Sequence, residues 1–290
     1  MLLDGKAVAE KIYAQIGEEL LHSSTKPCLV AILVGDNPAS QLYVRHKVAT
    51  CARVGMNSRP LFLPTHTTEQ ELLLLLSQLN EDVTVSGILV QLPLPPHIDP
   101  FRIAKAVAPD KDVDGVNPIN LGKLLLGEVD GFTPCTPLGI KMLLQHYNIP
   151  VAGRHVVIAG RSNIVGKPLA VLLVQKEQSA GATVTMVHSQ TPDIKKFILQ
   201  ADILVAAIGQ AQFFRADMIR PGAVIVDVGQ NRLADPSHPK GFRLVGDVAF
   251  EEVKDRCSAI TPVPGAVGPM TIAMLLSNTL EAWRKQGGLG

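Results

Sequence analysis

The chain lacks any long apolar run. Its longest leucine stretch, residues 72–76, is far shorter than the ~18 residues that a membrane-spanning helix needs. The N-terminal segment carries Asp4 and Lys6, whereas a secretory signal is apolar at the corresponding place. We therefore expect neither a membrane span nor a secretory signal.

Paired cysteines, paired histidines and an excess of one charge are also missing. The four cysteines form no C-x-x-C pair and the eight histidines form no H-x-x-x-H pair, so the sequence predicts neither a zinc site nor a disulfide framework. Reduced thiols in the cytoplasm are then expected. Lys plus Arg is 27 and Asp plus Glu is 26, which gives no electrostatic reason to expect nucleic acid or an anionic membrane as a partner.

What the chain does contain is an alternation of short apolar runs and longer helical stretches. In 290 residues, of which 47% are apolar, this pattern predicts an α/β fold with parallel sheets, in one large domain or two ordinary ones. The expected strands span 28–34, 87–92, 156–159, 183–187, 203–208 and 223–228. The expected helices lie near 38–55, 69–80, 137–147, 166–177, 192–200 and 269–285, with Asn37 as the cap of the first.

A glycine turn follows one of these strands. Residues 156–159 lead directly into the turn from Gly160 to Gly166, and a helix opens after it. Exposed amides and the positive end of a helix dipole favour an anion in that setting, so we expect a dinucleotide site. The turn departs from G-x-G-x-x-G, because Ser162 stands at the second glycine position and the last glycine comes one place late. A plain strand-to-helix connection is the alternative.

The residues after the next strand bear on which dinucleotide is bound. A site that prefers NAD usually has an acidic residue there to hold the ribose hydroxyls, and none is present at 188–191. Arg161 and Ser189 could instead hold a 2′-phosphate, which favours NADP. The alternative is that Arg161 is a solvated surface charge.

Polar residues in the first half are ambiguous from spacing alone. Tyr43 and Lys47 lie four apart on one helical face, which is also the spacing of an ordinary exposed pair. Gln91 ends a continuous apolar run, where a buried amide needs a partner. Residues 110–115 imitate the start of a calcium loop, but the twelfth position is Leu121 where a Glu is required. The three aspartates of that segment form either a turn with local hydrogen bonds or a ligand site.

Six segments, taken together, resemble one family. They are Tyr43–Lys47, Gly87–Pro95, Asp110–Gly115, Cys135–Pro137, Gly160–Gly166 and Thr261–Thr271. In this order they are similar to the bifunctional methylenetetrahydrofolate dehydrogenase/methenyltetrahydrofolate cyclohydrolase family of the FolD type, and the similarity runs over nearly the whole chain.

The resemblance implies two reactions of one-carbon metabolism in one site. NADP takes a hydride from the bridging methylene of 5,10-methylenetetrahydrofolate, and water opens the resulting methenyl cation to give 10-formyltetrahydrofolate. Lys47 corresponds to the family's catalytic lysine and Gln91 to its partner. Tyr43 corresponds to the ring that stacks on the folate and Asp114 to the group that holds the pterin. An ordinary lysine has a pKa near ~10.4, so desolvation or the methenyl cation must lower it for the amine to act as a base.

The resemblance also implies two α/β domains, the second a Rossmann-like parallel sheet, with an active-site cleft between them. The expected domains are a catalytic folate-binding domain of 1–138 and 269–290 and an NADP-binding domain of 139–268. The implied cofactor-binding residues are Gly160, Arg161, Ser162, Gly166, Ser189 and Gln230, and Pro262 and Gly265 join the substrate-binding residues. We expect a homodimer packed through the dinucleotide domains, NAD as the less favoured cofactor, and no metal.

Four residues depart from the family's pattern, one of which is Ala49, at a place where many relatives have a second basic residue. Ala266 replaces a common glycine, and its methyl group would crowd the substrate loop if the backbone there needed a positive φ. Gln230 replaces a common isoleucine, and Gln190 replaces a common basic residue, which weakens the expected preference for NADP. Two other functions stay open. One is a dehydrogenase without the hydrolysis step, and the other is a non-catalytic nucleotide sensor on the same fold.

Overall fold

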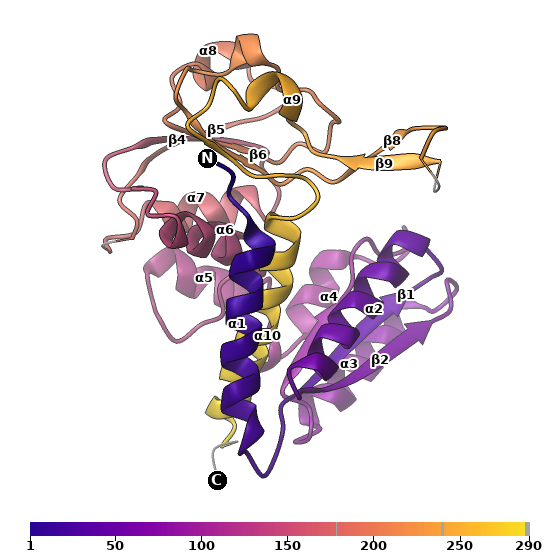
Figure 1. The fold of residues 1–290 in the computed structure, drawn as a ribbon. Helices are drawn as coiled ribbons and strands as arrows, with labels where there is room; N and C mark the ends of the chain where they lie inside the picture. The colour runs from indigo at the N-terminus through magenta and orange to yellow at the C-terminus, as the bar shows by residue number, and fades with distance from the viewer. Residues whose placement is uncertain (178, 239–240, 288–290) are drawn as a thin grey trace. The chain divides into compact units, whose positions relative to one another are not determined.

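The computed structural model describes residues 1–177, 179–238 and 241–287, and it divides into two compact units (Figure 1). The three-stranded unit comprises Glu10–Cys135 and Ile272–Gly290, and the five-stranded unit comprises Met1–Ala9 and Thr136–Thr271. The boundaries fall within α1 (Gly5–Leu21), at the start of α6 (Cys135–His146) and within α10 (Val267–Lys285). Each unit contains a parallel sheet, which confirms the predicted α/β class with two domains.

The sheet of the three-stranded unit has the order β2-β1-β3 and is parallel throughout. Its strands are β1 (Cys28–Val34), β2 (Asn57–Leu63) and β3 (Gly87–Val90). Every residue of the central β1 is buried, as its continuous apolar run predicts. The unpredicted β2 contains Pro60, which is tolerated because β2 lies at an edge of the sheet. β3 ends two residues before the expected range, although Gln91 N still donates to Ile32 O at 2.8 Å.

Two helices of this unit begin at the caps that the sequence offers. In α2 (Pro38–Arg53), the side chain of Asn37 accepts from Ala39 N and Ser40 N at 3.0 and 3.2 Å. In α3 (Glu69–Glu81), Thr68 and Glu71 form a capping box. Three further helical segments that were not predicted each begin at a proline, which suits the first helical turn. They are α4 (Pro100–Ala106), η1 (Pro109–Lys111) and α5 (Pro118–Leu126).

The five-stranded sheet is parallel and has the order β10-β7-β6-β4-β5. Its strands are β4 (His155–Ala159), β5 (Thr183–Val187), β6 (Ile203–Ala206), β7 (Val224–Asp227) and β10 (Ala259–Ile260). The chain runs from β4 outward to β5, and then returns to the other side of β4 for β6, β7 and β10. This reversal makes a switch point between β4 and β6, and ligands of such sheets bind outside the carboxyl ends of the strands there. The predicted Rossmann-like sheet is confirmed, with β6 and β7 each two residues shorter than expected.

Short helices and one hairpin complete this unit. The helices are α7 (Gly166–Leu173), α8 (Ile194–Ile198), η2 (Ala216–Met218) and α9 (Phe250–Val253). α8 starts two residues later than expected because Asp193 has a left-handed φ of 45°. The antiparallel pair β8 (Asn231–Ala234) and β9 (Phe242–Val245) extends as an arm (Figure 1). No helix in the described residues is long and apolar enough to cross a membrane.

Candidate active site

Lys47 and Gln91 meet in the three-stranded unit. Lys47 lies on α2, one helical turn after Tyr43, and Gln91 directly follows β3. Lys47 Nζ donates to Gln91 Oε1 at 2.9 Å, and Gln91 Nε2 donates to Leu92 O at 2.7 Å. The second bond holds the amide so that its oxygen faces the amine. Lys47 is therefore the partner that an amide at the end of a buried strand requires.

The charged residues of the acidic segment, residues 110–115, have two kinds of environment. Lys111 and Asp112 form local hydrogen bonds, whereas Asp114 acts on Lys47. Asp112 is 2% exposed and accepts a backbone N–H and the Nδ2 of Asn120, both at 2.8 Å. Lys111 is also buried, and its amine donates to two carbonyl oxygens at the end of α3, at 3.0 and 2.8 Å. Asp112 thus forms the locally bonded turn, while Asp114 stays half-buried and acts electrostatically on Lys47.

Burial governs the protonation of this group of side chains. It lowers the pKa of Lys47 below its usual value, and the negative charge of Asp114 opposes that shift without overcoming it. Burial likewise raises the pKa of Asp114, against the opposing effect of Lys47. The pKa of Cys135 lies well above its usual value for the same reason, and its thiol donates to Val113 O at 3.2 Å. Burial therefore shifts both groups toward their uncharged forms, the amine of Lys47 and the thiol of Cys135.

Asn278 supports this site and was not predicted. It lies on α10, 165 residues from its partner Val113. Its Nδ2 donates to Val113 O at 2.9 Å and to Thr133 O at 3.1 Å, and lies 3.7 Å from Cys135 Sγ. These bonds join the backbone just before Asp114 to the backbone just before Cys135. The signal available in the sequence was only an amide between Ser277 and Thr279 in a largely apolar helix, which does not identify its partner.

The glycine turn of the five-stranded unit is built by close backbone contacts. Gly160 has a φ of +122°, and a Cβ there would lie 2.1 Å from Ala207 O. A Cβ on Gly166 would lie 2.2 Å from Gly160 O. Ser162, at the second glycine position, accepts from Val165 N through its Oγ at 3.1 Å. The serine therefore closes the turn before α7, and both glycines are needed because no side chain fits.

Arg161 and Ser189 lie just after the carboxyl ends of two neighbouring strands, β4 and β5. β4 pairs with β5 so that Ala159 lies opposite Val187, and Gly160 N donates to Val187 O at 2.9 Å. The segments that carry Arg161 and Ser189 therefore start side by side. Both side chains are exposed, and Arg161 makes no hydrogen bond or ion pair with the described part of the chain.

Gln230, Pro262 and Gly265 lie on the loops after β7 and β10. Gln230 is exposed, and its Nε2 lies 2.8 Å from the point that a Cβ on Gly268 would occupy. Gly265 has a φ of +128°, whereas Ala266 is not among the residues with positive φ and is buried. The crowding that a positive φ at Ala266 would have caused does not arise.

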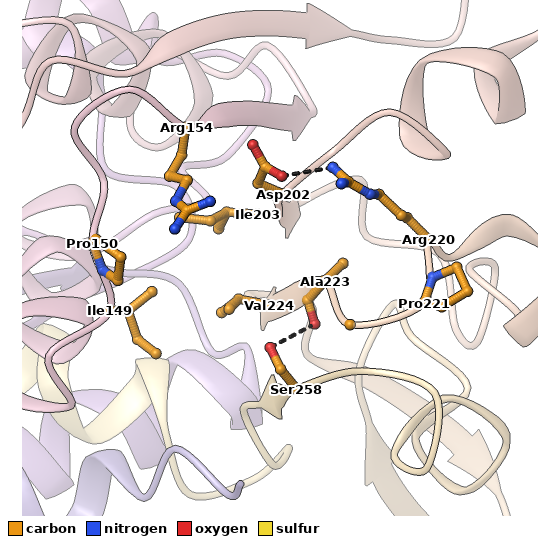
Figure 2. Close-up of a pocket in the computed structure, with 11 residues that line it drawn as sticks. Ile149, Pro150, Arg154, Asp202, Ile203, Arg220, Pro221, Ala223, Val224 and Ser258 are labelled. Carbon is orange, nitrogen blue, oxygen red and sulfur yellow. Dashed lines mark hydrogen bonds and ion pairs between the residues drawn. The ribbon is translucent and has the colours of Figure 1, made fainter.

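Other places for a ligand are few in the described residues. A hollow of about 340 Å³ lies at the amino ends of the five-stranded sheet, where Arg154, Asp202 and Ser258 precede β4, β6 and β10 (Figure 2). This edge is opposite the glycine turn, and none of the predicted site residues lines the hollow. No group of three or more His, Cys, Asp or Glu side chains in the described chain is placed to hold a metal ion.

Two models of a single family match the chain. The tetrahydrofolate dehydrogenase/cyclohydrolase catalytic domain matches residues 3–114, and the NAD(P)-binding domain of the same family matches residues 134–287. The chain belongs to the tetrahydrofolate dehydrogenase/cyclohydrolase family. The predicted resemblance is confirmed, as is an NAD(P)-binding domain in the second part of the chain.

Similar proteins extend the match over the full length. The bifunctional protein FolD of Chlamydia abortus is 51% identical over 285 residues, which are 98% of this chain and 99% of the relative. The solved bifunctional FolD from Campylobacter jejuni has a TM-score of 0.92 and 48% identity, covering 98% of this chain and 99% of that one. The Trypanosoma brucei methylenetetrahydrofolate dehydrogenase-cyclohydrolase, solved with NADP cofactor and inhibitor, has a TM-score of 0.92 and 40% identity, covering 98% and 97%. The predicted bifunctional dehydrogenase and cyclohydrolase is confirmed by these similarities.

Proposed function

We propose that this chain oxidises 5,10-methylenetetrahydrofolate with NADP and hydrolyses the product to 10-formyltetrahydrofolate, with Lys47 as the base of the second step. The observation that carries the proposal is the 2.9 Å hydrogen bond between Lys47 Nζ and Gln91 Oε1, at a place where burial lowers the pKa of the amine. An exposed lysine is protonated at neutral pH and cannot take a proton, and burial shifts the amine of Lys47 toward the neutral form that a base requires.

Hydrolysis assigns separate tasks to Lys47 and Gln91. Lys47 accepts a proton from water as the oxygen bonds to the methenyl carbon. The bond between that carbon and N5 then breaks. N5 takes up the proton that Lys47 holds, the new hydroxyl releases its proton to solvent as the formyl C=O forms, and the formyl group stays on N10. Gln91 accepts a hydrogen bond from the amine and so aims its lone pair. The methenyl cation adds a positive charge nearby, which lowers the pKa of Lys47 further.

The oxidation step demands positioning more than acid–base chemistry. NADP, when bound, supplies the hydride acceptor. The two nitrogens that flank the methylene stabilise the cation that develops, so the protein mainly orders the two reactants. Gly160, Ser162 and Gly166 form a compact turn before α7 that brings backbone close to a pyrophosphate.

Four residues would hold the folate. Asp114, as a carboxylate, accepts hydrogen bonds from the amide N–H and amine of the pterin ring. Tyr43 lies one helical turn before Lys47 and stacks on that ring. Pro262 and Gly265 belong to the substrate loop, where the positive φ of Gly265 permits a tight bend. Tyr43 and Asp114 belong to the three-stranded unit, whereas Pro262 and Gly265 belong to the five-stranded unit, which would also hold the dinucleotide.

NADP is favoured over NAD by the residues after β4 and β5. Arg161 is exposed and unpaired within the described chain, and Ser189 lies two residues after the end of the adjacent strand, β5. Together they would hold a 2′-phosphate through a charge-assisted pair and a hydroxyl donor. Gln190 is exposed and uncharged, so it adds no second cation and the preference for NADP is less than absolute.

We also infer a cytoplasmic homodimer that packs through the dinucleotide-binding units. β5 lies at an open edge of the five-stranded sheet, and an unpaired strand edge favours association. The near balance of 27 basic and 26 acidic residues gives no support for a nucleic acid or membrane partner. All four cysteines are free thiols, in keeping with a reducing compartment.

Two assays on the purified protein test the proposed function. One follows NADPH or NADH formation from 5,10-methylenetetrahydrofolate, and the other follows loss of methenyl absorbance without cofactor. We expect both activities, with NADP preferred. Hydride transfer without hydrolysis would support the dehydrogenase alternative, and NADP binding without either activity would support the sensor. Both alternatives leave Lys47 and Gln91 without a task.

A further inference from the structure

Two carboxylates are buried in the five-stranded unit without a cation. Asp227 ends β7 and is 3% exposed, and Asp247 lies after β9 and is 0% exposed. Neither forms an ion pair within the described residues. An ionised carboxylate is costly to bury unless hydrogen bonds replace those it made to water. The donors around Asp227 and Asp247 therefore explain how the fold tolerates both buried side chains.

Asp247 links the loop after β6 to the start of the hairpin. Its Oδ2 accepts from Ile208 N at 2.6 Å and from Gly209 N at 2.9 Å. Its Oδ1 accepts from Asn231 Nδ2 at 2.9 Å. Asn231 directly follows Gln230, a proposed cofactor-binding residue. One side chain therefore fixes two segments that follow neighbouring strands.

Asp227 links the same region to the loop after β10. It accepts from Asp247 N and Val248 N, both at 2.9 Å, and from Gly229 N at 3.0 Å. Its own backbone N–H donates to Thr261 Oγ1 at 2.7 Å. Thr261 opens the segment that contains Pro262 and Gly265. The two aspartates thus join the loops after β6, β7 and β10 in one network, and the link to the last of these loops is made by the backbone N–H of Asp227.

Glycines make the space that this network occupies. A Cβ on Gly229 would lie 2.3 Å from Asp247 Oδ1, and a Cβ on Gly246 would lie 1.8 Å from Asp227 Oδ2. Neither glycine has a φ in the left-handed region, so the close approach of the carboxylates is what excludes a side chain. The carboxylates and the glycines therefore form a single fitted arrangement.

The place of the network on the sheet indicates its role. β5 lies on one side of β4, and the three strands that the network joins lie on the other. In Rossmann-like sheets the ribose of the adenosine half is held after the second strand, here β5, and the dinucleotide crosses the switch point. The nicotinamide half then faces the loops after β6 and β7. We propose that Asp227 and Asp247 are positioning residues that fix these loops for the nicotinamide half of NADP. The inference rests on the proposed function.

Asp247→Asn tests this role with little change in size. The amide nitrogen that replaces one oxygen must face either the backbone N–H groups of Ile208 and Gly209 or the side-chain amide nitrogen of Asn231. We expect the KM for NADP to rise about tenfold, the cost of one lost charge-assisted hydrogen bond. Binding of 2′,5′-ADP, the adenosine half alone, should stay within about twofold of the original, as should methenyl hydrolysis, which uses no cofactor.

Asp202→Asn is the matched control. Asp202 also accepts a backbone N–H, from His155 at 2.9 Å, and pairs with Arg220, but it lies at the amino ends of the same sheet (Figure 2). It should leave the KM for NADP within about twofold. If Asp247→Asn does not fold, Asn231→Ala removes a single donor to Asp247 and should raise the same KM by a smaller factor.

Several results would overturn the inference. Equal losses in hydrolysis and in hydride transfer would mean that Asp247 supports folding alone. Equal weakening of 2′,5′-ADP and NADP would mean that it supports the whole dinucleotide site. An unchanged KM for NADP in both Asp247→Asn and Asn231→Ala would show that Asp247 does not position the loops for the cofactor. Failure of the proposed function is distinct, because it would appear in the unmodified protein as an absence of NADP reduction.

Discussion

The two units treat charge at the carboxyl ends of their strands in opposite ways. In the three-stranded unit, Lys47 and Asp114 are only partly buried, and the amine of Lys47 donates to Gln91. In the five-stranded unit, Asp227 and Asp247 are fully buried and each accepts three hydrogen bonds. One unit leaves its amine with few hydrogen-bond partners, while the other uses its carboxyl groups as internal supports, although burial raises the pKa of Asp227 to about 7.

This contrast follows from what the two proposed reactions need. Hydrolysis requires a group that exchanges a proton with water, so its charge must remain adjustable. Hydride transfer requires the cofactor and the substrate to be held in place, so rigid loops serve it better than titratable side chains. The two activities should therefore respond separately to substitutions in the two units.

The largest expected effect comes from Lys47→Met. Without the base, methenyl hydrolysis should fall by about a hundredfold or more, while some NADP reduction survives because that step needs positioning only. Loss of methenyl absorbance and NADPH formation are measured on the same preparation. Lys11→Met, an exposed lysine of the same unit, is the control and should change neither activity. Unchanged hydrolysis in Lys47→Met would remove Lys47 from the reaction.

Asp114→Asn should weaken the folate in both reactions. Loss of the carboxylate should raise the KM for the folate about thirtyfold, because one charge-assisted hydrogen bond to the pterin is lost and the other, now to an amide oxygen, is weakened. The charge of Asp114 raises the pKa of Lys47, so its removal should shift the acid limb of the hydrolysis profile to lower pH. Asp110→Asn, an exposed aspartate of the same segment, is the control. A limb that moves to higher pH would contradict the coupling between Asp114 and Lys47.

Arg161→Ala should affect the cofactor and spare hydrolysis. The KM for NADP should rise about tenfold as one charge-assisted contact to the 2′-phosphate is lost, while the KM for NAD stays unchanged. Steady-state assays with each cofactor measure this. Arg154→Ala, at the opposite edge of the same sheet, should leave both constants alone. Equal effects on NADP and NAD would mean that Arg161 does not distinguish them.

The smallest expected effect comes from Ala266→Gly. Ala266 is buried and does not have a positive φ, so glycine brings no relief of strain. It should lower the free energy of unfolding by about 0.5–1 kcal/mol through the greater freedom of the unfolded chain. Chemical denaturation measures this, and both activities should stay within about twofold. A clear gain in either activity would show that the methyl group hinders the substrate loop.

The sequence predicted the parts of the fold that carry strong local signals. The apolar runs of β1 and β5 matched the expected ranges, and the cap of α2 is Asn37, as the sequence predicts. β2 gave a weak signal because it contains Pro60, which an edge strand tolerates, and β10 has only two residues. Local patterns of this kind reach no further than a few residues along the chain.

The supports of the site could not be predicted in the same way. Lys47 and Gln91 were found through short motifs, but Asn278 reaches its partner across 165 residues. Asp227 and Asp247 have no shared motif, since the groups that donate to their carboxylates come from the segments after β6, β7 and β9. Such residues are identified by burial and hydrogen bonding, which appear only once the chain is folded.

Direct titration of Lys47 tests the central claim most directly. Lysine carbons next to the amine are labelled with ¹³C, and NMR follows their chemical shifts with pH, with Lys47→Met identifying the signal. Burial lowers the pKa of this amine, so the account predicts a midpoint clearly below the usual lysine value of 10.5. A midpoint at or above 10.5 would leave Lys47 protonated at neutral pH and would contradict its role as the base.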